Sequence, residues 1–111
     1  MATAPTEPVR TAIPVPLERI VEFCRKWELT EFALFGSILR DDFRPESDVD
    51  VLVDYRKGWP HTLFDWVLMQ DELQAIFGRR VDLIARRGIE RSRNPWRRGR
   101  ILGSARTVYA A

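Results

Sequence analysis

The feature that most constrains this 111-residue chain is an alternation of valine and aspartate over residues 47–54. Valine stands at every odd position from 49 to 53, whereas Asp48 and Asp50 stand at the even positions on either side of Val49. Successive side chains of a β-strand point to opposite faces, so the pattern predicts a strand with an apolar core face and a carboxylate face. Asp48 and Asp50 would lie ~6.6 Å apart along it, which lets their carboxylates converge on metal ions. Charges that simply face solvent are the alternative.

Two further features match the chemistry of this carboxylate face. Gly36-Ser37 follows a predicted apolar strand over Glu31–Phe35. Glycine lets a phosphate approach the backbone closely, and the serine hydroxyl with neighbouring N–H groups can bind its oxygens. Asp82 interrupts a third predicted strand, Arg80–Ala85, where a carboxylate in the core is costly unless it is paired or metal-bound. If this strand lies beside the first, Asp82 completes a triad with the two aspartates.

The remaining periodicity indicates helices on either side of these strands. We expect helices over 17–27 and 63–78, a short helix within 38–46, a loop over 86–95 and a final helix from Trp96 to about Tyr109. The fold class is therefore α/β (α+β), with a small mixed sheet flanked by helices. Four prolines in residues 1–16 predict a flexible lead-in, followed by one domain over residues 17–111.

Composition excludes several classes of protein. A single cysteine, Cys24, excludes an intrachain disulfide and a cysteine zinc site, and a single histidine, His61, excludes two-histidine chemistry. No apolar stretch is long enough for a membrane helix, and no signal peptide is evident. We therefore expect a cytoplasmic protein without a membrane partner.

The charge is unevenly distributed. Residues 1–78 carry 14 acidic and 8 basic side chains, whereas residues 79–111 carry 2 acidic and 10 basic ones. The basic segment could face an acidic protein surface or a bound triphosphate, and the sequence does not separate these. Direct nucleic-acid binding is not expected, because the acidic part would repel it. The tryptophans are expected to pack in the core or at an interface rather than stack on bases; they are Trp27, Trp59, Trp66 and Trp96.

Taken together, these motifs resemble a known family. Gly36-Ser37, ten further residues and then Asp48-Val49-Asp50 look like the Gly-Ser-x10-Asp-x-Asp signature of polymerase-beta-like nucleotidyltransferases. The later strand with Asp82 and the length resemble the minimal nucleotidyltransferase (MNT) branch. The resemblance covers roughly residues 17–109 and implies the fold of that family.

The resemblance also implies roles for residues. The first two aspartates would ligate two Mg²⁺ ions, and the third would help hold the metal beside the acceptor hydroxyl. The Gly-Ser pair would hold the β- and γ-phosphates of ATP, with an arginine near the triphosphate. These roles fall on Asp48, Asp50 and Asp82 for catalysis and metal binding, and on Gly36, Ser37 and Arg40 for the nucleotide.

The function that the resemblance implies is that of an antitoxin in a type VII-like HEPN/MNT toxin–antitoxin pair. Such an enzyme transfers AMP from ATP to a tyrosine of its partner, a HEPN-domain ribonuclease toxin. The run Leu39-Arg40-Asp41 departs from the Ala-Arg-Gly of many relatives. An antitoxin that neutralises its toxin by binding only is therefore an alternative, and transfer to a small hydroxylated substrate is a third.

Overall fold

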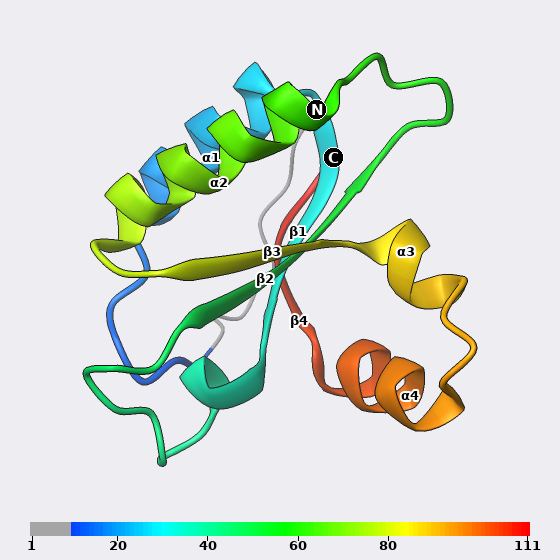
Figure 1. Ribbon diagram of the computed structural model, residues 1–111. Coiled ribbons are helices and arrows are strands. Elements are labelled where there is room, and N and C mark those ends of the chain that lie inside the picture. Colours follow the sequence, from blue (N-terminus) through cyan, green and yellow to red (C-terminus); the bar gives the residue numbers. More distant parts are fainter. Residues whose placement is uncertain (1–9) are drawn as a thin grey trace.

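The computed structural model describes residues 10–111, which form one mixed sheet between two layers of helices (Figure 1). The strand order is β3-β2-β1-β4, with β1 antiparallel to both β2 and β4, and β2 parallel to β3. This confirms the predicted fold class. In chain order the elements are α1 (Leu17–Lys26), β1 (Leu29–Phe35), the 3-10 turn η1 (Gly36–Leu39), β2 (Val49–Tyr55), α2 (Leu63–Phe77), β3 (Val81–Ala85), α3 (Arg86–Glu90), α4 (Pro95–Ser104) and β4 (Arg106–Ala110).

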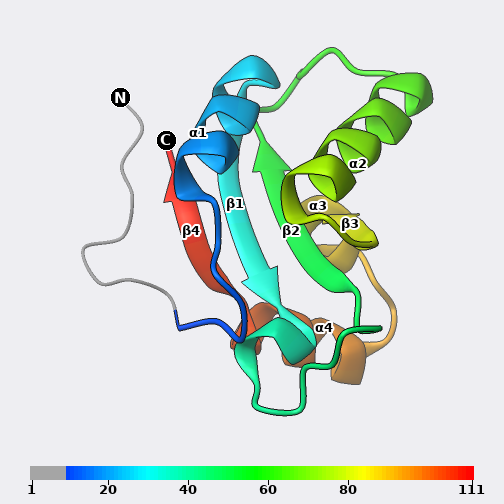
Figure 2. The same ribbon diagram turned by 90° about the vertical axis from the view of Figure 1, so that its left-hand side faces the viewer.

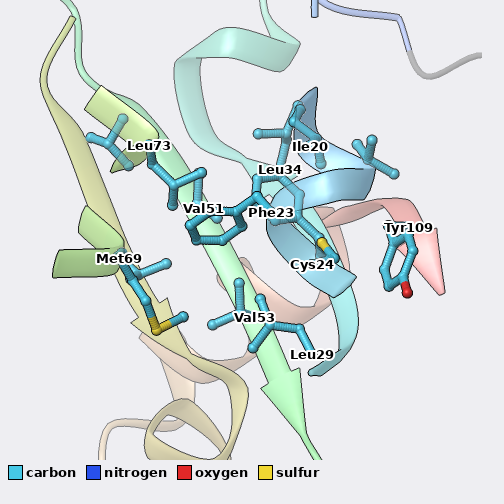
Figure 3. Close-up of a cluster of buried hydrophobic side chains, with 14 of the residues drawn as sticks. Ile20, Phe23, Cys24, Leu29, Leu34, Val51, Val53, Met69, Leu73 and Tyr109 are labelled. Atoms are coloured by element: carbon cyan, nitrogen blue, oxygen red, sulfur yellow. The ribbon is translucent and has the colours of Figure 1, made fainter. Parts of the chain in front are cut away.

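Each face of the sheet is covered by a different pair of helices. The valines of β2 face α1 and α2 and join the main core, in which side chains such as Phe23, Met69 and Leu73 are buried (Figure 3). The opposite face is covered by α3 and α4, through a smaller cluster that includes Leu52, Ile89 and Ile101. Figure 2 shows α1 and α2 on the near side of the sheet, with α4 behind it. The alternation predicted for β2 is therefore present, and its aspartates lie on the side of α3 and α4.

Local sequence explains where α2 begins and ends. The Thr62 side chain accepts a hydrogen bond from the Asp65 N–H, and the Asp65 carboxylate accepts one from the Thr62 N–H. This reciprocal cap satisfies two of the free N–H groups of the first turn. Gly78 then ends the helix with φ +70°, a conformation that glycine adopts without strain. The helix predicted over 63–78 is confirmed.

The C-terminal part of the chain differs from its predicted structure. The last helix ends at Ser104 rather than near Tyr109, and β4 follows it as an unpredicted fourth strand. The helical spacing of apolar residues continues past residue 104, but the β-branched and aromatic residues 107–109 gain more by pairing with β1. The segment expected to be a loop over 86–95 contains α3. The short helix expected within 38–46 is limited to η1, followed by turns.

The N-terminal lead-in contacts the core where the structure describes it. Ala12 donates its N–H to the Ile38 carbonyl at 2.7 Å, and Ile13 and Val15 pack against the main core. Residues 1–9 of the expected flexible segment lie outside the described residues. Packing therefore begins before residue 17, the expected start of the domain. Within residues 10–111, no helix has the length and apolarity to cross a membrane.

Candidate active site

The parallel pairing of β2 and β3 brings two of the three predicted carboxylates together. Asp50 is the register partner of Asp82, and adjacent strands lie about 4.8 Å apart. Asp82 is exposed, so the expectation of a carboxylate within the core is wrong. The reason is that β3 is an edge strand whose two apolar neighbours, Val81 and Leu83, are buried against the other face. The expected proximity of Asp82 to the aspartates of β2 is present.

Gly36 packs directly against Asp50. The strand register pairs Phe35 with Asp50, so the turn that follows β1 passes over this carboxylate. Gly36 has φ +77°, and a Cβ atom at this position would overlap Oδ2 of Asp50. Both the backbone conformation and the close approach therefore require glycine. The Gly-Ser turn and the carboxylate are placed against each other, as binding of a metal–phosphate complex would need.

Asp48 lies at the entrance to β2, one residue before the strand. Its Oδ1 atom is 3.9 Å from Nε of Arg80, and both side chains are substantially exposed. A pair of this length at the surface contributes little to stability. A divalent metal ion that binds the Asp48 carboxylate therefore has only a weak contact with Arg80 to displace.

The electrostatics of the site centre on Asp50. Burial raises the pKa of its carboxyl from 3.8 to about 6, and the charges of Asp82 and Asp48 add to the rise, while Arg40 opposes it. Arg40 also donates a hydrogen bond of 3.0 Å from Nε to Asp42, and this bond lowers the pKa of the Asp42 carboxyl. Asp50 therefore lies in an excess of negative charge, which Arg40 offsets in part.

A cleft of about 760 Å³ extends from Asp50 to α4. One wall is formed by Gly36, Ser37 and Arg40 beside Asp50, the residues to which the family resemblance assigns nucleotide binding. Asp41, which departs from the usual family pattern, is exposed and does not line the cleft. The other wall, which the sequence did not predict, consists of α4 residues at helical spacing together with the N-cap residue, namely Asn94, Trp96, Arg97, Gly99, Arg100, Ile101, Gly103 and Ser104.

The arginines of the basic segment, residues 79–111, have two kinds of surroundings in the structure. Arg86 pairs with Glu31 at 2.9 Å, and Thr107 donates a hydrogen bond of 3.0 Å to the same carboxylate. Arg87 pairs with Asp54 at 3.4 Å and lies over the Tyr55 ring. These two arginines therefore connect elements of the fold. In α4, Arg97 and Arg100 line the cleft instead, whereas Arg98 donates a hydrogen bond of 2.9 Å to the Ser92 carbonyl.

The residues at the site fit a divalent cation. Within residues 10–111, no three carboxylate, imidazole or thiolate groups are gathered closely enough to form a complete metal cage. Mg²⁺ does not need one, because it is usually bound by one or two carboxylates together with water and substrate phosphates. The raised pKa of Asp50, caused in part by its acidic neighbours, is the repulsion that such a cation would relieve.

The chain is similar to known proteins. The family model described as "Nucleotidyltransferase domain" matches residues 17–107. The protein adenylyltransferase MntA of Thermococcus cleftensis is 30% identical over 69 residues, which are 62% of this chain and 68% of the relative.

Solved structures share the fold. A chain described as a minimal nucleotidyltransferase is 30% identical, with a TM-score of 0.63 over 81% of this chain and 86% of its own length. A complex of a tri-AMPylated HEPN toxin from Shewanella oneidensis with its MNT antitoxin matches at 18% identity and a TM-score of 0.57, covering 86% of this chain and 70% of that one. This chain belongs to the nucleotidyltransferase domain family, and it is a nucleotidyltransferase of the minimal fold.

Proposed function

We propose that this enzyme is the antitoxin of a type VII-like HEPN/MNT pair and transfers AMP from ATP to a tyrosine of a HEPN-domain ribonuclease toxin. The observation that carries the proposal is Asp50, opposed by Asp82 and covered by Gly36, at one end of a cleft of nucleotide size. The relative from Thermococcus cleftensis is named a protein adenylyltransferase, and the Shewanella oneidensis complex contains an AMPylated HEPN toxin. Both names support a protein acceptor.

In this proposal the reaction is an in-line displacement at the α-phosphorus of ATP. The tyrosine oxygen forms a bond to the α-phosphorus, the bond from that phosphorus to the bridging oxygen breaks, and pyrophosphate leaves. Asp48 and Asp50 would hold Mg²⁺, which when bound neutralises phosphate charge and lowers the pKa of the attacking hydroxyl. Gly36-Ser37 would bind the β- and γ-phosphates through N–H groups and the serine hydroxyl.

Asp82 is suited to receive the acceptor. Its carboxylate is exposed on the edge strand, next to Asp50 in register. A tyrosine on another protein can therefore reach it without entering the interior of this chain. In the proposed reaction Asp82 accepts the proton of the tyrosine hydroxyl as the oxygen attacks.

The first test is calorimetric titration of ATP, with and without Mg²⁺. We expect binding by the wild type that depends on Mg²⁺ and is lost in the Asp48→Asn/Asp50→Asn double variant. Asp71→Asn is a matched control, because Asp71 is an exposed aspartate of α2 outside the cleft. Metal-dependent binding that persists in the double variant would contradict the assigned roles.

The second test is transfer to the partner. The protein is incubated with Mg²⁺, ATP and a purified HEPN-domain toxin, and the toxin is analysed by mass spectrometry for added AMP. We expect modified tyrosine with the wild type and with Asp71→Asn, and none with the double variant. If the double variant still neutralises the ribonuclease fully, the antitoxin acts by binding only, and the enzymatic proposal fails.

A further inference from the structure

Trp96 differs from the other tryptophans of the chain. Trp59 is buried in the main core, and Trp27 and Trp66 pack against it. Trp96 is 82% exposed and lines the cleft that contains Asp50. Burial of an indole ring stabilises a protein strongly, and the Trp96 ring is not buried by this chain. Its exposure in a cleft therefore indicates that a molecule from outside the chain covers it.

The backbone at Trp96 is fixed although its ring is free. The Asn94 side chain caps α4 by accepting hydrogen bonds of 3.1 Å from the N–H groups of Trp96 and Arg97. At the other end of the helix, β4 starts at Arg106, which pairs with Leu34 of β1. The helix that carries the ring is therefore tethered at its C-terminal end to the strand that leads into Gly36.

This tethering sets the direction of the cleft. The C-terminal end of α4 lies beside the Gly36-Ser37 turn, because Leu34, the partner of Arg106, lies two residues before Gly36. Trp96 lies eight residues earlier than Ser104, about 12 Å along the helix axis. A nucleotide with its phosphates at Gly36-Ser37 therefore extends its base toward Trp96.

The cleft face of α4 is also shaped for close approach. Gly99 and Gly103 line the cleft one turn apart, and a Cβ atom at either position would meet nothing within 4 Å. Neither has a positive φ, so the backbone itself does not require glycine there. Alanine would favour the helix at both positions. Glycine instead leaves the backbone uncovered toward the cleft, between the turn and the ring.

The charge of this wall suits a polyanion. Arg97 and Arg100 both line the cleft, and neither forms an ion pair with a residue that the structure describes. Arg40 faces them from the opposite wall. Arginines therefore line both walls of the cleft, so the charge of a bound triphosphate would be neutralised from both sides.

We propose that α4 is the nucleoside-binding wall of the cleft and that the Trp96 ring stacks on the base of the bound nucleotide. The proposal rests on the proposed function, because it takes ATP as the nucleotide. According to this proposal, the affinity for ATP has one contribution from the phosphates and a separate one from the base. Gly36-Ser37 and the arginines bind phosphates, whereas Trp96 binds the base and contributes nothing to a ligand that lacks one.

The test compares ATP with inorganic tripolyphosphate, both titrated calorimetrically in the presence of Mg²⁺. Trp96→Ala is expected to weaken ATP binding about 10-fold or more, as loss of a base–aromatic stack does, and to leave tripolyphosphate binding unchanged. Trp96→Phe, which keeps a ring, should restore most of the affinity. Phe64→Ala is the control, since Phe64 is an exposed ring on α2 outside the cleft, and it should bind both ligands as the wild type does.

A second pair of variants separates binding from folding. Gly99→Ala should raise the melting temperature, because alanine favours the helix, and yet weaken ATP binding by narrowing the cleft. Gly88→Ala in α3 also has open space at its Cβ but lies outside the cleft, so it should bind ATP as the wild type does. A merely structural role for the glycine of α4 predicts stability and binding that change in the same direction.

The outcomes distinguish this inference from the proposed function. Equal ATP affinity of Trp96→Ala and wild type overturns the stacking proposal, while the proposed function stands. If Trp96→Ala binds ATP normally but transfers no AMP to the toxin, the ring contacts the protein acceptor, and the stacking proposal is again overturned. If the wild type binds tripolyphosphate but not ATP, both proposals fail.

Discussion

Replacing Asp50 by asparagine is expected to stabilise the metal-free protein while abolishing metal-dependent nucleotide binding. In the folded chain the pKa of Asp50 is raised to about 6, by burial first and then by the charges of Asp82 and Asp48. A folded-state pKa above the unfolded value favours folding at low pH, and that contribution is lost as the pH rises through about 6. At pH 7.5 the ionised carboxylate therefore opposes folding, and asparagine removes the opposition.

The expected size of the effect follows from the two pKa values. A rise in the pKa of Asp50 from 3.8 to about 6 means that the ionised carboxylate lowers the free energy of unfolding by about 3 kcal/mol if solvent does not screen it. Asp50 is only half-buried, so solvent screening reduces this, and we expect about 1 kcal/mol. One kcal/mol raises the melting temperature of a domain of this size by roughly 4–8 °C. The asparagine has nearly the shape of aspartate and so leaves the contact with Gly36 in place.

The assay is thermal unfolding followed by circular dichroism in EDTA, at pH 7.5 and at pH 5. Asp50→Asn should melt several degrees above the wild type at pH 7.5, and the gap should shrink at pH 5, where the wild-type carboxylate is protonated. Asp71→Asn should show no gap at either pH. Added Mg²⁺ should stabilise the wild type more than Asp50→Asn. A variant that melts below the wild type at pH 7.5, or a gap of the same size at both pH values, would refute this electrostatic reasoning.

Three further substitutions test the packing around the site, each by urea unfolding. Gly36→Ala should lower the free energy of unfolding by about 2–3 kcal/mol, because the new methyl group displaces Asp50 and alanine is also strained at a positive φ. Gly58→Ala is the control, since Gly58 has φ +81° but open space, and it should cost about 1 kcal/mol. Equal losses in the two variants would contradict the contact between Gly36 and Asp50. Glu31→Ala should cost about 1–2 kcal/mol, because it removes the closer of the two acidic partners of Arg86 and the acceptor of the Thr107 hydroxyl. Loss of the long surface pair of Glu28, in Glu28→Ala, should cost less than about 0.5 kcal/mol. Ile101→Ala should cost about 2–4 kcal/mol by opening the smaller core cluster, and a loss below 1 kcal/mol would show that the cluster is dispensable.

The carboxylate face was predictable because its signal is local. The alternation around Asp50 has the period of a strand, and the apolar run before Gly36 identifies the strand that leads into the turn. Pairing Asp82 with Asp50 required only that two predicted strands be neighbours, which they are. The exposure of Asp82 was mispredicted because periodicity does not tell which strand forms the edge of a sheet.

The second wall of the cleft was not predictable from local patterns. The spacing of Trp96, Arg100 and Ser104 indicates one face of a helix, but nothing in it shows that this face lies opposite Gly36. That placement depends on β4, whose pairing with β1 joins residues far apart in the chain. The strand itself was hidden because Val108 continues the helical spacing of the residues before it. The β-branched and aromatic run that ends at Tyr109 was the available signal.

The position of β4 has a consequence for synthesis of the protein. It pairs with β1, and the hydrogen bond from Thr107 to Glu31 spans 76 residues of sequence. Contacts of such separation form late, because the intervening chain must be available first. While the chain is being translated, the edge of β1 that pairs with β4 stays open until residues 106–110 leave the ribosome. Until then α4 lacks the strand that tethers its C-terminal end beside Gly36. We therefore expect a ribosome-bound chain that already contains all three aspartates to be unable to hold ATP until its last strand is released.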